Sequence, residues 1–352
     1  MRQPFSDDDA AEPGEGFAGS AATPPSPDLG HLGRRLLVPA ILGLLALVGL
    51  ALVADVRKLA GRLGEFDPAL LAPVLALSLV NYGLRFWRWQ LYLRALGVEL
   101  PAGRSLGVFL VGFLLSVTPG KAGELGKAWL VRELGGGPAR RVVPAVLAER
   151  ATDLLGVVLL IALGALAFPA GPWIAAGGVA AVLAGAALLG WRRGAEALFA
   201  RCERWPWIGP RVHHLHELYE RLRRLVSPRL LAAGLALSAL AWGAEGVGFR
   251  LVVGSYSPAA GLLPSLFNYA ASTLAGAVSM LPGGLLASEG SLTALLNAQG
   301  LDTATAATAT LIIRAATLWF AVALGLGALP FVLRRLRRTG RDDAAAGGRG
   351  AY

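Results

Sequence analysis

The 352-residue sequence contains a single cysteine, Cys202. One cysteine excludes a disulfide within the chain and a cluster of thiolates around a metal ion. Charged residues are also scarce, at 16% of the chain, whereas 55% of the residues are hydrophobic. The mean hydropathy of +0.57 is well above that of water-soluble domains. The composition therefore excludes a soluble enzyme and indicates a membrane protein.

The few charges are unevenly distributed along the chain. Residues 1–30 contain six acidic residues and one basic residue, so the net charge of +10 for the whole chain becomes +15 for residues 31–352. Residues 1–30 and 336–352 lack apolar periodicity, and we expect both to be disordered tails. The basic residues flank apolar segments, as at a membrane surface, so nucleic acid is not an expected partner.

Six uninterrupted apolar blocks are long enough to cross a bilayer as α-helices. A helix of about 20 residues spans the hydrocarbon core of roughly 30 Å. The blocks are Leu36–Ala54 and residues 69–93, 143–167, 172–191, 229–253 and 304–333. Arginines cluster before the first block, after the last block and in the 192–229 connection. The predicted fold is therefore an all-α polytopic protein of the cell membrane, with both termini in the cytoplasm.

The 192–229 connection contains apolar residues at three- and four-residue intervals from Val212 to Val226, with arginines between them. This spacing predicts an amphipathic helix at about residues 195–226, with its apolar side in the membrane interface and its arginines toward anionic headgroups. His213 and Glu217 share a face of this helix, but the ligand order of a zinc protease is absent. We expect neither a metal nor another cofactor.

Two further apolar stretches, about residues 103–134 and 260–300, are interrupted by proline and glycine. Proline removes a helical hydrogen bond and glycine permits a tight turn, so each stretch is predicted to form a re-entrant hairpin. The predicted hairpin tips are Pro119 and Gly120 in the first stretch and Pro282, Gly283 and Gly284 in the second.

The surroundings of the two breaks match each other. In each, an arginine lies 32 to 34 residues before the proline, a glutamate 5 to 7 residues after it, and a second arginine 25 to 26 residues after the glutamate. The arginine distribution gives the two halves, about residues 69–191 and 229–335, opposite orientations, as in the inverted repeats of transporters. Irregular backbone is tolerated at membrane depth only beside protein or a water-filled cavity. We therefore expect both tips to line one polar cavity, where helix N-termini favour an anion.

Many ionisable residues lie within the apolar segments or at their edges. Each would cost about 2.5–3.5 kcal/mol if it faced lipid at the centre of a helix, so we expect them to face inward. They are Lys121, Glu124, Glu149, Arg150, Asp153, Glu245, Arg250, Glu289 and Arg314. Two interpretations remain open: structural ion pairs that hold the hairpins against neighbouring helices, or groups that bind a ligand in the cavity.

The segment Arg85-Phe-Trp-Arg-Trp-Gln90 combines basic and aromatic residues. Such residues are typical of a membrane interface, where tryptophan lies at headgroup level and arginine extends to water. Alternatively, Arg85 and Arg88 share a helix face and could bind one phosphate together.

These motifs resemble the lysylphosphatidylglycerol synthase transmembrane-domain family, also called flippase-like integral membrane proteins. The resemblance covers roughly residues 36–335, and its motifs are Arg85-Phe-Trp-Arg-Trp, Thr118-Pro-Gly-Lys-Ala-Gly-Glu124 with Lys127, Glu149-Arg-Ala-Thr-Asp153, and Pro282-Gly-Gly before Glu289. It implies a helical domain with two re-entrant hairpins that moves a phospholipid or another lipid-linked anion between leaflets. No soluble aminoacyl transferase domain follows Arg338, so aminoacyl transfer is not expected. Leu286 stands where the family commonly has glycine, which makes the second tip bulkier.

The leading prediction is a translocator of lipids with anionic headgroups, with helix N-termini assisting its basic residues. Its predicted binding residues are Arg85, Arg88, Lys121, Glu124, Lys127, Glu149, Arg150, Asp153, Arg250, Glu289 and Arg314. An intramembrane transferase with Glu149 or Asp153 as base is the alternative, although no metal-diphosphate motif, nucleophile elbow or Walker loop favours it. A third hypothesis is a scaffold that recruits an envelope-synthesis enzyme through residues 195–226. Small residues on the helices would equally permit a homo-oligomer.

Overall fold

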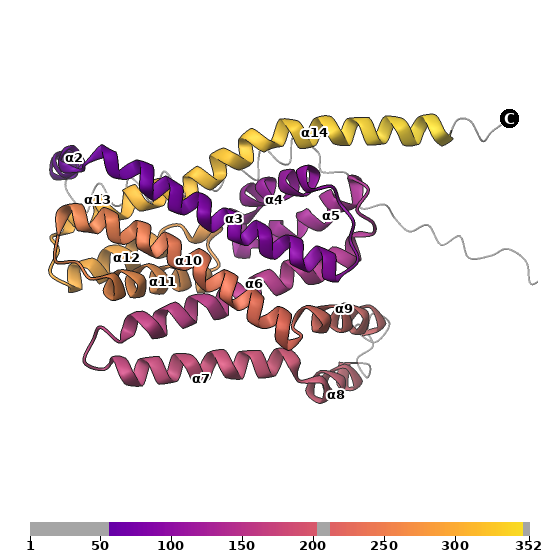
Figure 1. Cartoon of the computed structure of the whole chain (residues 1–352), viewed down its shortest axis with the longest axis horizontal. Coiled ribbons are helices and arrows are strands. Elements are labelled where there is room, and N and C mark those ends of the chain that lie inside the picture. The colour runs from indigo at the N-terminus through magenta and orange to yellow at the C-terminus, as the bar shows by residue number, and fades with distance from the viewer. Residues whose placement is uncertain (1–55, 203–211, 348–352) are drawn as a thin grey trace, which may run out of the picture.

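The computed structural model describes residues 56–202 and 212–347. All regular secondary structure in these two ranges is helical, as the sequence predicts (Figure 1). The first apolar block, Leu36–Ala54, and the predicted N-terminal tail lie outside the described residues.

Four helices in the described ranges are long and apolar enough to cross a membrane. They are Pro68–Ala95, Gly171–Gly190, Pro228–Tyr256 and Thr303–Arg337, and they coincide with four of the predicted blocks. The predicted 143–167 block is also a helix, α6 (Ala139–Ala165). Its 27 residues extend about 40 Å, but ionisable side chains interrupt its apolar character. The chain is therefore a multi-pass membrane protein, and the number of six crossings stays a prediction.

Helix starts in this fold follow from short local signals. The carboxylate of Asp67 accepts a hydrogen bond of 2.9 Å from the amide of Ala69 and starts the turn that leads into α3 (Leu71–Ala95). Asp302 does the same for α13 (Thr303–Arg314), where it accepts from the amide of Thr305 at 3.1 Å. An N-cap side chain satisfies an amide that the first turn of a helix leaves without a partner.

The two stretches broken by proline and glycine form helical hairpins. The first consists of α4 (Ala102–Ser116), the 3₁₀ turn η2 (Pro119–Leu125) and α5 (Gly126–Glu133). The second consists of α11 (Leu262–Val278), the 3₁₀ turn η4 (Pro282–Gly284) and α12 (Ala287–Ala298). In both hairpins the proline begins the 3₁₀ turn, where its missing amide hydrogen removes no helical bond.

The hairpins approach each other from opposite ends of the molecule. α4 and α5 lie at the end that carries α8 (Arg192–Cys202) and α9 (Val212–Leu225), and α11 and α12 lie at the other end (Figure 1). The tips η2 and η4 contact each other. A Cβ atom added to Gly283 would lie 3.2 Å from Cγ1 of Val117, so the second tip packs closely against the end of the first hairpin helix.

Long helices enclose the two tips. α10 (Pro228–Tyr256) packs along α3, and α6 packs against both α10 and α11. Glycine permits a close approach of α6 to α11, because a Cβ on Gly164 would lie 2.6 Å from the amide nitrogen of Phe267. Three apolar clusters form the interior of the described part of the chain. The first includes Tyr82 and Trp89, the second includes Tyr269, and a small third one includes Leu160.

The last crossing contains an irregular turn. α13 continues through the π-helix η5 (Ala315–Trp319) into α14 (Phe320–Gly347). The Ser78 hydroxyl donates a hydrogen bond of 2.8 Å to the carbonyl of Ala316, and the Tyr82 hydroxyl donates one of 2.6 Å to the carbonyl of Thr317. Side chains of α3 therefore donate hydrogen bonds to carbonyls of the widened turn. Such π-helical turns are frequent at functional sites.

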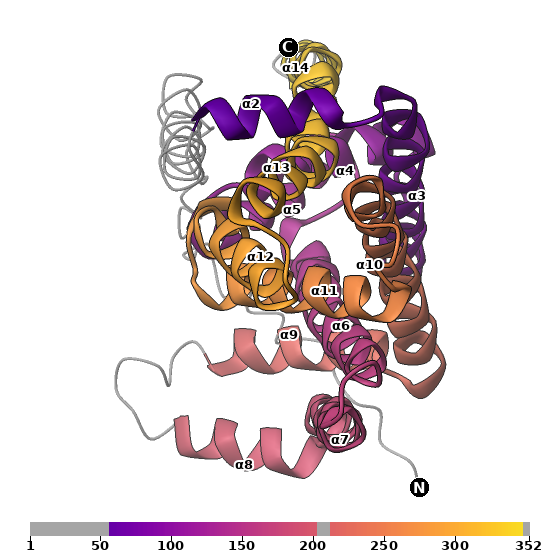
Figure 2. The same ribbon diagram turned by 90° about the vertical axis from the view of Figure 1, so that its left-hand side faces the viewer.

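Two predictions about the polar segments are wrong. Residues 336–347 belong to α14 rather than to a disordered tail, because alanine, arginine and leucine continue a helix readily. The single helix predicted at about 195–226 is two separate helices, α8 and α9 (Figure 2). α9 packs against α6, and its Leu225 is buried in the first apolar cluster, so this part of the apolar side contacts protein rather than the membrane interface.

Candidate functional site

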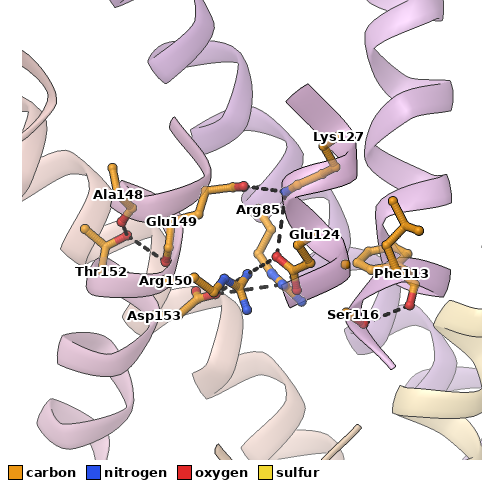
Figure 3. Close-up of polar contacts among 12 residues, drawn as sticks. Arg85, Phe113, Ser116, Glu124, Lys127, Ala148, Glu149, Arg150, Thr152 and Asp153 are labelled. Carbon is orange, nitrogen blue, oxygen red and sulfur yellow. Dashed lines mark hydrogen bonds and ion pairs between the residues drawn. The ribbon is translucent and has the colours of Figure 1, made fainter. Parts of the chain in front are cut away.

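Asp153 on α6 is the centre of an ionic network. Its carboxylate lies 2.8 Å from Nη1 of Arg88, 3.0 Å from Nη2 of Arg150 and 3.8 Å from Nη2 of Arg85. Asp153 is buried and also accepts a hydrogen bond of 3.2 Å from the indole nitrogen of Trp242 on α10. Helices α3, α6 and α10 are therefore joined at one carboxylate. Figure 3 shows Asp153 beside Arg85 and Arg150.

A second buried pair lies beside this network. Nζ of Lys127 is 2.5 Å from Oε2 of Glu149 and 4.6 Å from the centre of the Trp89 ring. All three side chains are almost completely buried. The pair connects α5 of the first hairpin to α6, and it fits the interpretation of a structural ion pair.

Each hairpin is also fixed by an ion pair between a glutamate that follows its proline and an arginine on the next long helix. In the first half, Nη2 of Arg150 lies 3.2 Å from Oε2 of Glu124. In the second half, Nε of Arg314 lies 2.6 Å from Oε1 of Glu289. The matching spacings in the sequence therefore correspond to matching contacts.

A polar cavity of about 90 Å³ lies where the two tips meet. The side chains and backbone that line it come from both hairpins and from α3, α10 and the last crossing. The lining includes Tyr82, Arg85, Phe113, Ser116, Glu124, Trp242, Glu245, Tyr269, Gly283, Gly284, Ser288, Arg314 and Thr317. This volume holds several water molecules.

Arg85 is the cation that α3 places in the cavity wall. Its guanidinium lies 5.6 Å from the centre of the Phe113 ring and 5.5 Å from the ring of Trp242. Aromatic rings on two sides hold a guanidinium in place through cation–π attraction. Its Nε is buried without a hydrogen-bond partner among the described residues.

An apolar groove of about 300 Å³ adjoins the polar cavity. Arg150 and Asp153 lie at its polar end, and the rest of its lining is mainly aliphatic. The residues that line both the groove and the cavity are Trp242, Thr273, Gly276 and Ala277. Val278 and Met280 in the groove wall are 72% and 62% exposed, so the groove opens on the outer surface of the helices.

The second tip contains strained backbone. Leu286, at the start of α12, has φ of 70° and ψ of −50°, a conformation that costs energy for a residue with a Cβ atom. Met280 also has a positive φ, of 55°. The side chain of Leu286 is 42% exposed, so it is accommodated at the surface at the cost of backbone strain.

The structure brings only part of the predicted residue set to the cavity and groove. Arg85, Glu124 and Arg314 line the cavity, and Arg150 and Asp153 line the groove. The remaining predicted residues lie elsewhere: Arg88, Lys127, Glu149 and Glu289 are buried in ion pairs outside both linings, and Arg250 donates to the Pro258 carbonyl at 3.5 Å. The side chains of Pro119, Gly120 and Lys121 are outside the described residues, as are those of His213 and His214.

The interface interpretation of the Arg85-Phe-Trp-Arg-Trp-Gln90 segment applies only to Trp87, which is 59% exposed. Trp89 and Arg88 are completely buried. The sequence could not distinguish these positions, because every residue of the segment is equally compatible with either side of a helix.

The cavity wall also contains side chains outside the predicted set of binding residues, among them Tyr82, Trp242, Glu245 and Tyr269. The sequence predicts that Glu245 faces inward, but its distance along the chain from the matched arginines and glutamates does not assign it to a site. Trp242 lies three residues before Glu245, which places both on one face of α10, and this pairing is the signal that could have indicated the position.

Comparison with known proteins agrees with this architecture. A UPF0104 membrane protein from Methanothermobacter thermautotrophicus is 24% identical over 327 residues, which are 86% of this chain and 96% of that protein. Glycosyltransferase AglD from Haloferax volcanii is 32% identical over 142 residues, which are 36% of this chain and 22% of that protein. Residues 40–325 match the family described as the lysylphosphatidylglycerol synthase TM region. The chain therefore belongs to the lysylphosphatidylglycerol synthase transmembrane-region family.

Proposed function

We propose that this protein moves an anionic phospholipid, or another lipid-linked phosphate, between the two leaflets of the cell membrane. The observation that carries the proposal is the continuity between the polar cavity, which has arginines in its wall, and the apolar groove, which opens outward. A phospholipid has the same two parts, a charged headgroup and apolar chains. The headgroup would enter the cavity while an acyl chain lies in the groove beside Val278 and Met280.

Two arginines from opposite halves would hold the phosphate. Arg85 and Arg314 both line the cavity, and Arg85 has a donor without a partner in the described part of the chain. Arginine suits this role because its guanidinium binds two phosphate oxygens at once. Ser288, in the first turn of α12, places the N-terminus of that helix at the cavity wall, where helix amides favour an anion.

The arrangement of the hairpins supports an alternating mechanism. They enter from opposite ends and meet at their tips, which is the geometry of two re-entrant segments in an inverted repeat. The end with α8 and α9 carries most of the loop arginines, so we assign this end and both chain termini to the cytoplasm. Rocking of one half against the other would expose the cavity to each leaflet in turn.

A fluorescent-phospholipid translocation assay in proteoliposomes tests the proposal. Wild-type protein is expected to move labelled phosphatidylglycerol between leaflets. Arg85→Gln should slow this movement at least about tenfold, which corresponds to about 1.4 kcal/mol of lost interaction with the phosphate. Arg94→Gln is the matched control, because Arg94 lies on the same helix with an exposed side chain and outside the cavity lining. Equal rates for liposomes with and without wild-type protein would contradict the proposal.

The similarity to Glycosyltransferase AglD supports a second candidate, a transferase or accessory role in the synthesis of envelope glycoconjugates. The sequence offers Glu149 or Asp153 as the base for such chemistry. Glu149 is 1% exposed and paired with Lys127, away from the cavity. Asp153 lines the groove but is paired with Arg88 and Arg150. Incubation with a polyprenyl-phosphate sugar and a divalent metal ion separates the candidates. A transferase gives a lipid product of new mass, whereas a translocator leaves the mass of the lipid unchanged.

A further inference from the structure

Glu245 is a buried carboxylate in the wall of the cavity. It lies on α10, is 4% exposed and contributes to the cavity lining. The hydroxyl of Tyr269 on α11 donates a hydrogen bond of 2.6 Å to Oε2 of Glu245. Tyr269 is itself buried and lines the same cavity.

Glu245 differs from the other buried carboxylates around the cavity in having no paired cation among the side chains that the structure describes. Glu124, Glu149, Asp153 and Glu289 each have a lysine or arginine nitrogen within 3.2 Å. Among the described side chains, which do not include that of Lys121, no lysine or arginine nitrogen pairs with the Glu245 carboxylate within 4.0 Å. Protonation of any of the other four would break an ion pair, whereas protonation of Glu245 breaks none.

Every helix packed against this part of α10 presents an ionisable group to Glu245. They are Tyr82 and Arg85 from α3, Asp153 from α6, Tyr269 from α11 and Arg314 from α13. Both arginines already pair with other carboxylates, Arg85 with Asp153 and Arg314 with Glu289. An ionised carboxylate without a close cation is costly away from bulk water, and a proton from the cavity water removes that cost.

Protonation of Glu245 changes the net charge of the ionic network around the cavity. Its described members are the cations Arg85, Arg88, Lys127, Arg150 and Arg314 and the carboxylates Glu124, Glu149, Asp153, Glu245 and Glu289. Protonation of Glu245 adds one positive charge to this network. A phosphodiester headgroup with one negative charge offsets that added charge when it enters the cavity.

We propose that Glu245 binds one proton together with each monoanionic phosphodiester headgroup, so that the lipid and the proton cross together. This inference rests on the proposed translocation and adds its coupling ion. Glu245 takes the proton from cavity water as the headgroup enters, and it returns the proton to water when the headgroup leaves on the other side.

The coupling is tested by measuring the translocation of fluorescent phosphatidylglycerol in proteoliposomes. A pH gradient is imposed across the membrane while the membrane potential is clamped. For wild-type protein, one pH unit should change the rate by up to about tenfold, because one pH unit is worth about 1.4 kcal/mol per proton. Glu245→Gln should translocate at a rate that does not respond to the gradient, since glutamine is always neutral. Glu65→Gln, a change at an exposed glutamate of α2 (Val56–Glu65), should keep the wild-type response. A wild-type rate that ignores the gradient would overturn the coupling while leaving translocation intact.

Infrared difference spectroscopy of the purified protein provides a measurement that needs no translocation. A protonated carboxylic acid has a C=O stretch apart from the carboxylate bands, and this band should be present in wild type and Glu65→Gln and lost in Glu245→Gln. If wild type shows the band but moves no lipid, the proposed function fails and the proton site stands. If the band is absent at every pH at which the protein remains folded, the proton site is overturned.

Tyr269→Phe is the alternative variant if Glu245→Gln does not fold. It keeps the carboxyl group but removes the hydrogen bond that favours the ionised form. The pH midpoint of the wild-type response should therefore move upward, and an unchanged midpoint in this variant would count against Glu245 as the proton carrier.

Discussion

Arg314 holds both sides of the second hairpin tip. Its Nε lies 2.6 Å from Oε1 of Glu289, and its Nη2 donates a hydrogen bond of 3.1 Å to the carbonyl of Gly283. The guanidinium therefore connects the turn η4 to the first turn of α12 and faces the cavity at the same time. Stability and ligand binding depend on the same side chain, and a pair of variants can separate them.

Arg314→Leu should destabilise the protein by about 3–5 kcal/mol, because it leaves Glu289 buried without a counter-charge. The double variant Arg314→Leu, Glu289→Leu removes both charges and should recover most of that loss. Thermal unfolding in detergent measures both values. Lipid translocation should stay low in the double variant, since the cation of the cavity is still missing.

The result that would contradict this assignment is a double variant with wild-type translocation. Arg314 would then be a structural residue only. Addition of the single variant Glu289→Leu completes a double-mutant cycle, which gives the coupling energy of the pair, because two side chains in contact are not expected to have additive effects.

The hairpins were predictable because proline and glycine act locally. Pro119 and Pro282 each stand beside glycine within an apolar run, a combination that ends a helix and permits a turn, and both begin the 3₁₀ turn of a hairpin. The rule that irregular backbone at membrane depth needs a protein or water neighbour predicts that the two tips meet, and η2 and η4 do contact each other, while their depth in the membrane stays a prediction.

The division of the charged residues was not predictable. Arg85 and Arg88 are three positions apart on α3, yet Arg85 lines the cavity and Arg88 is completely buried against Asp153. This difference depends on where α6 and α10 lie around α3, which is a property of tertiary packing and leaves no trace in the local sequence. The same applies to α9, whose amphipathic pattern fits a membrane surface and a protein surface equally well.

Close backbone packing at the second tip gives a prediction about glycine. Gly284 has φ of +66°, and a Cβ atom there would lie 3.0 Å from Cα of Gly276 on α11. Gly284→Ala should therefore destabilise the protein by about 1–3 kcal/mol, through an unfavourable backbone conformation and a displaced hairpin tip. Thermal unfolding in detergent measures the change.

Gly290→Ala is the matched control on the helix that follows. No atom lies within 4 Å of the position of its added Cβ, and the residue is in the interior of α12. Alanine favours a helix over glycine by about 0.5–1 kcal/mol, so this variant should be neutral or slightly more stable. Equal losses in the two variants would show that the tip does not depend on close contact with α11.

Asp302, in the connection between α12 and α13, gives a prediction about pH. Its carboxylate accepts hydrogen bonds from the side chain and amide of Thr305 and pairs with Arg62 at 3.2 Å. The hydrogen bonds from Thr305, followed by the charge of Arg62, lower the pKa of Asp302 below its ordinary value. A carboxylate with a lowered pKa in the folded state contributes stability above the pKa of the unfolded chain and loses it as the pH falls through the folded-state value.

Thermal unfolding measured between pH 7 and pH 3 should therefore show a smaller acid-induced loss of stability for Asp302→Asn than for wild type, because the asparagine amide oxygen caps the helix at every pH. At pH 7, Asp302→Ala should cost about 1 kcal/mol, the usual effect of removing an N-cap, and Asp302→Asn should cost less. Arg62→Gln removes the exposed ion pairs of Arg62 with Asp302 and Glu65, and it should change stability by at most about 1 kcal/mol. If Asp302→Asn and wild type lost stability in parallel as the pH fell, the acid sensitivity would have to come from other carboxylates, with the pairs of Glu124 and Glu289 the next to test.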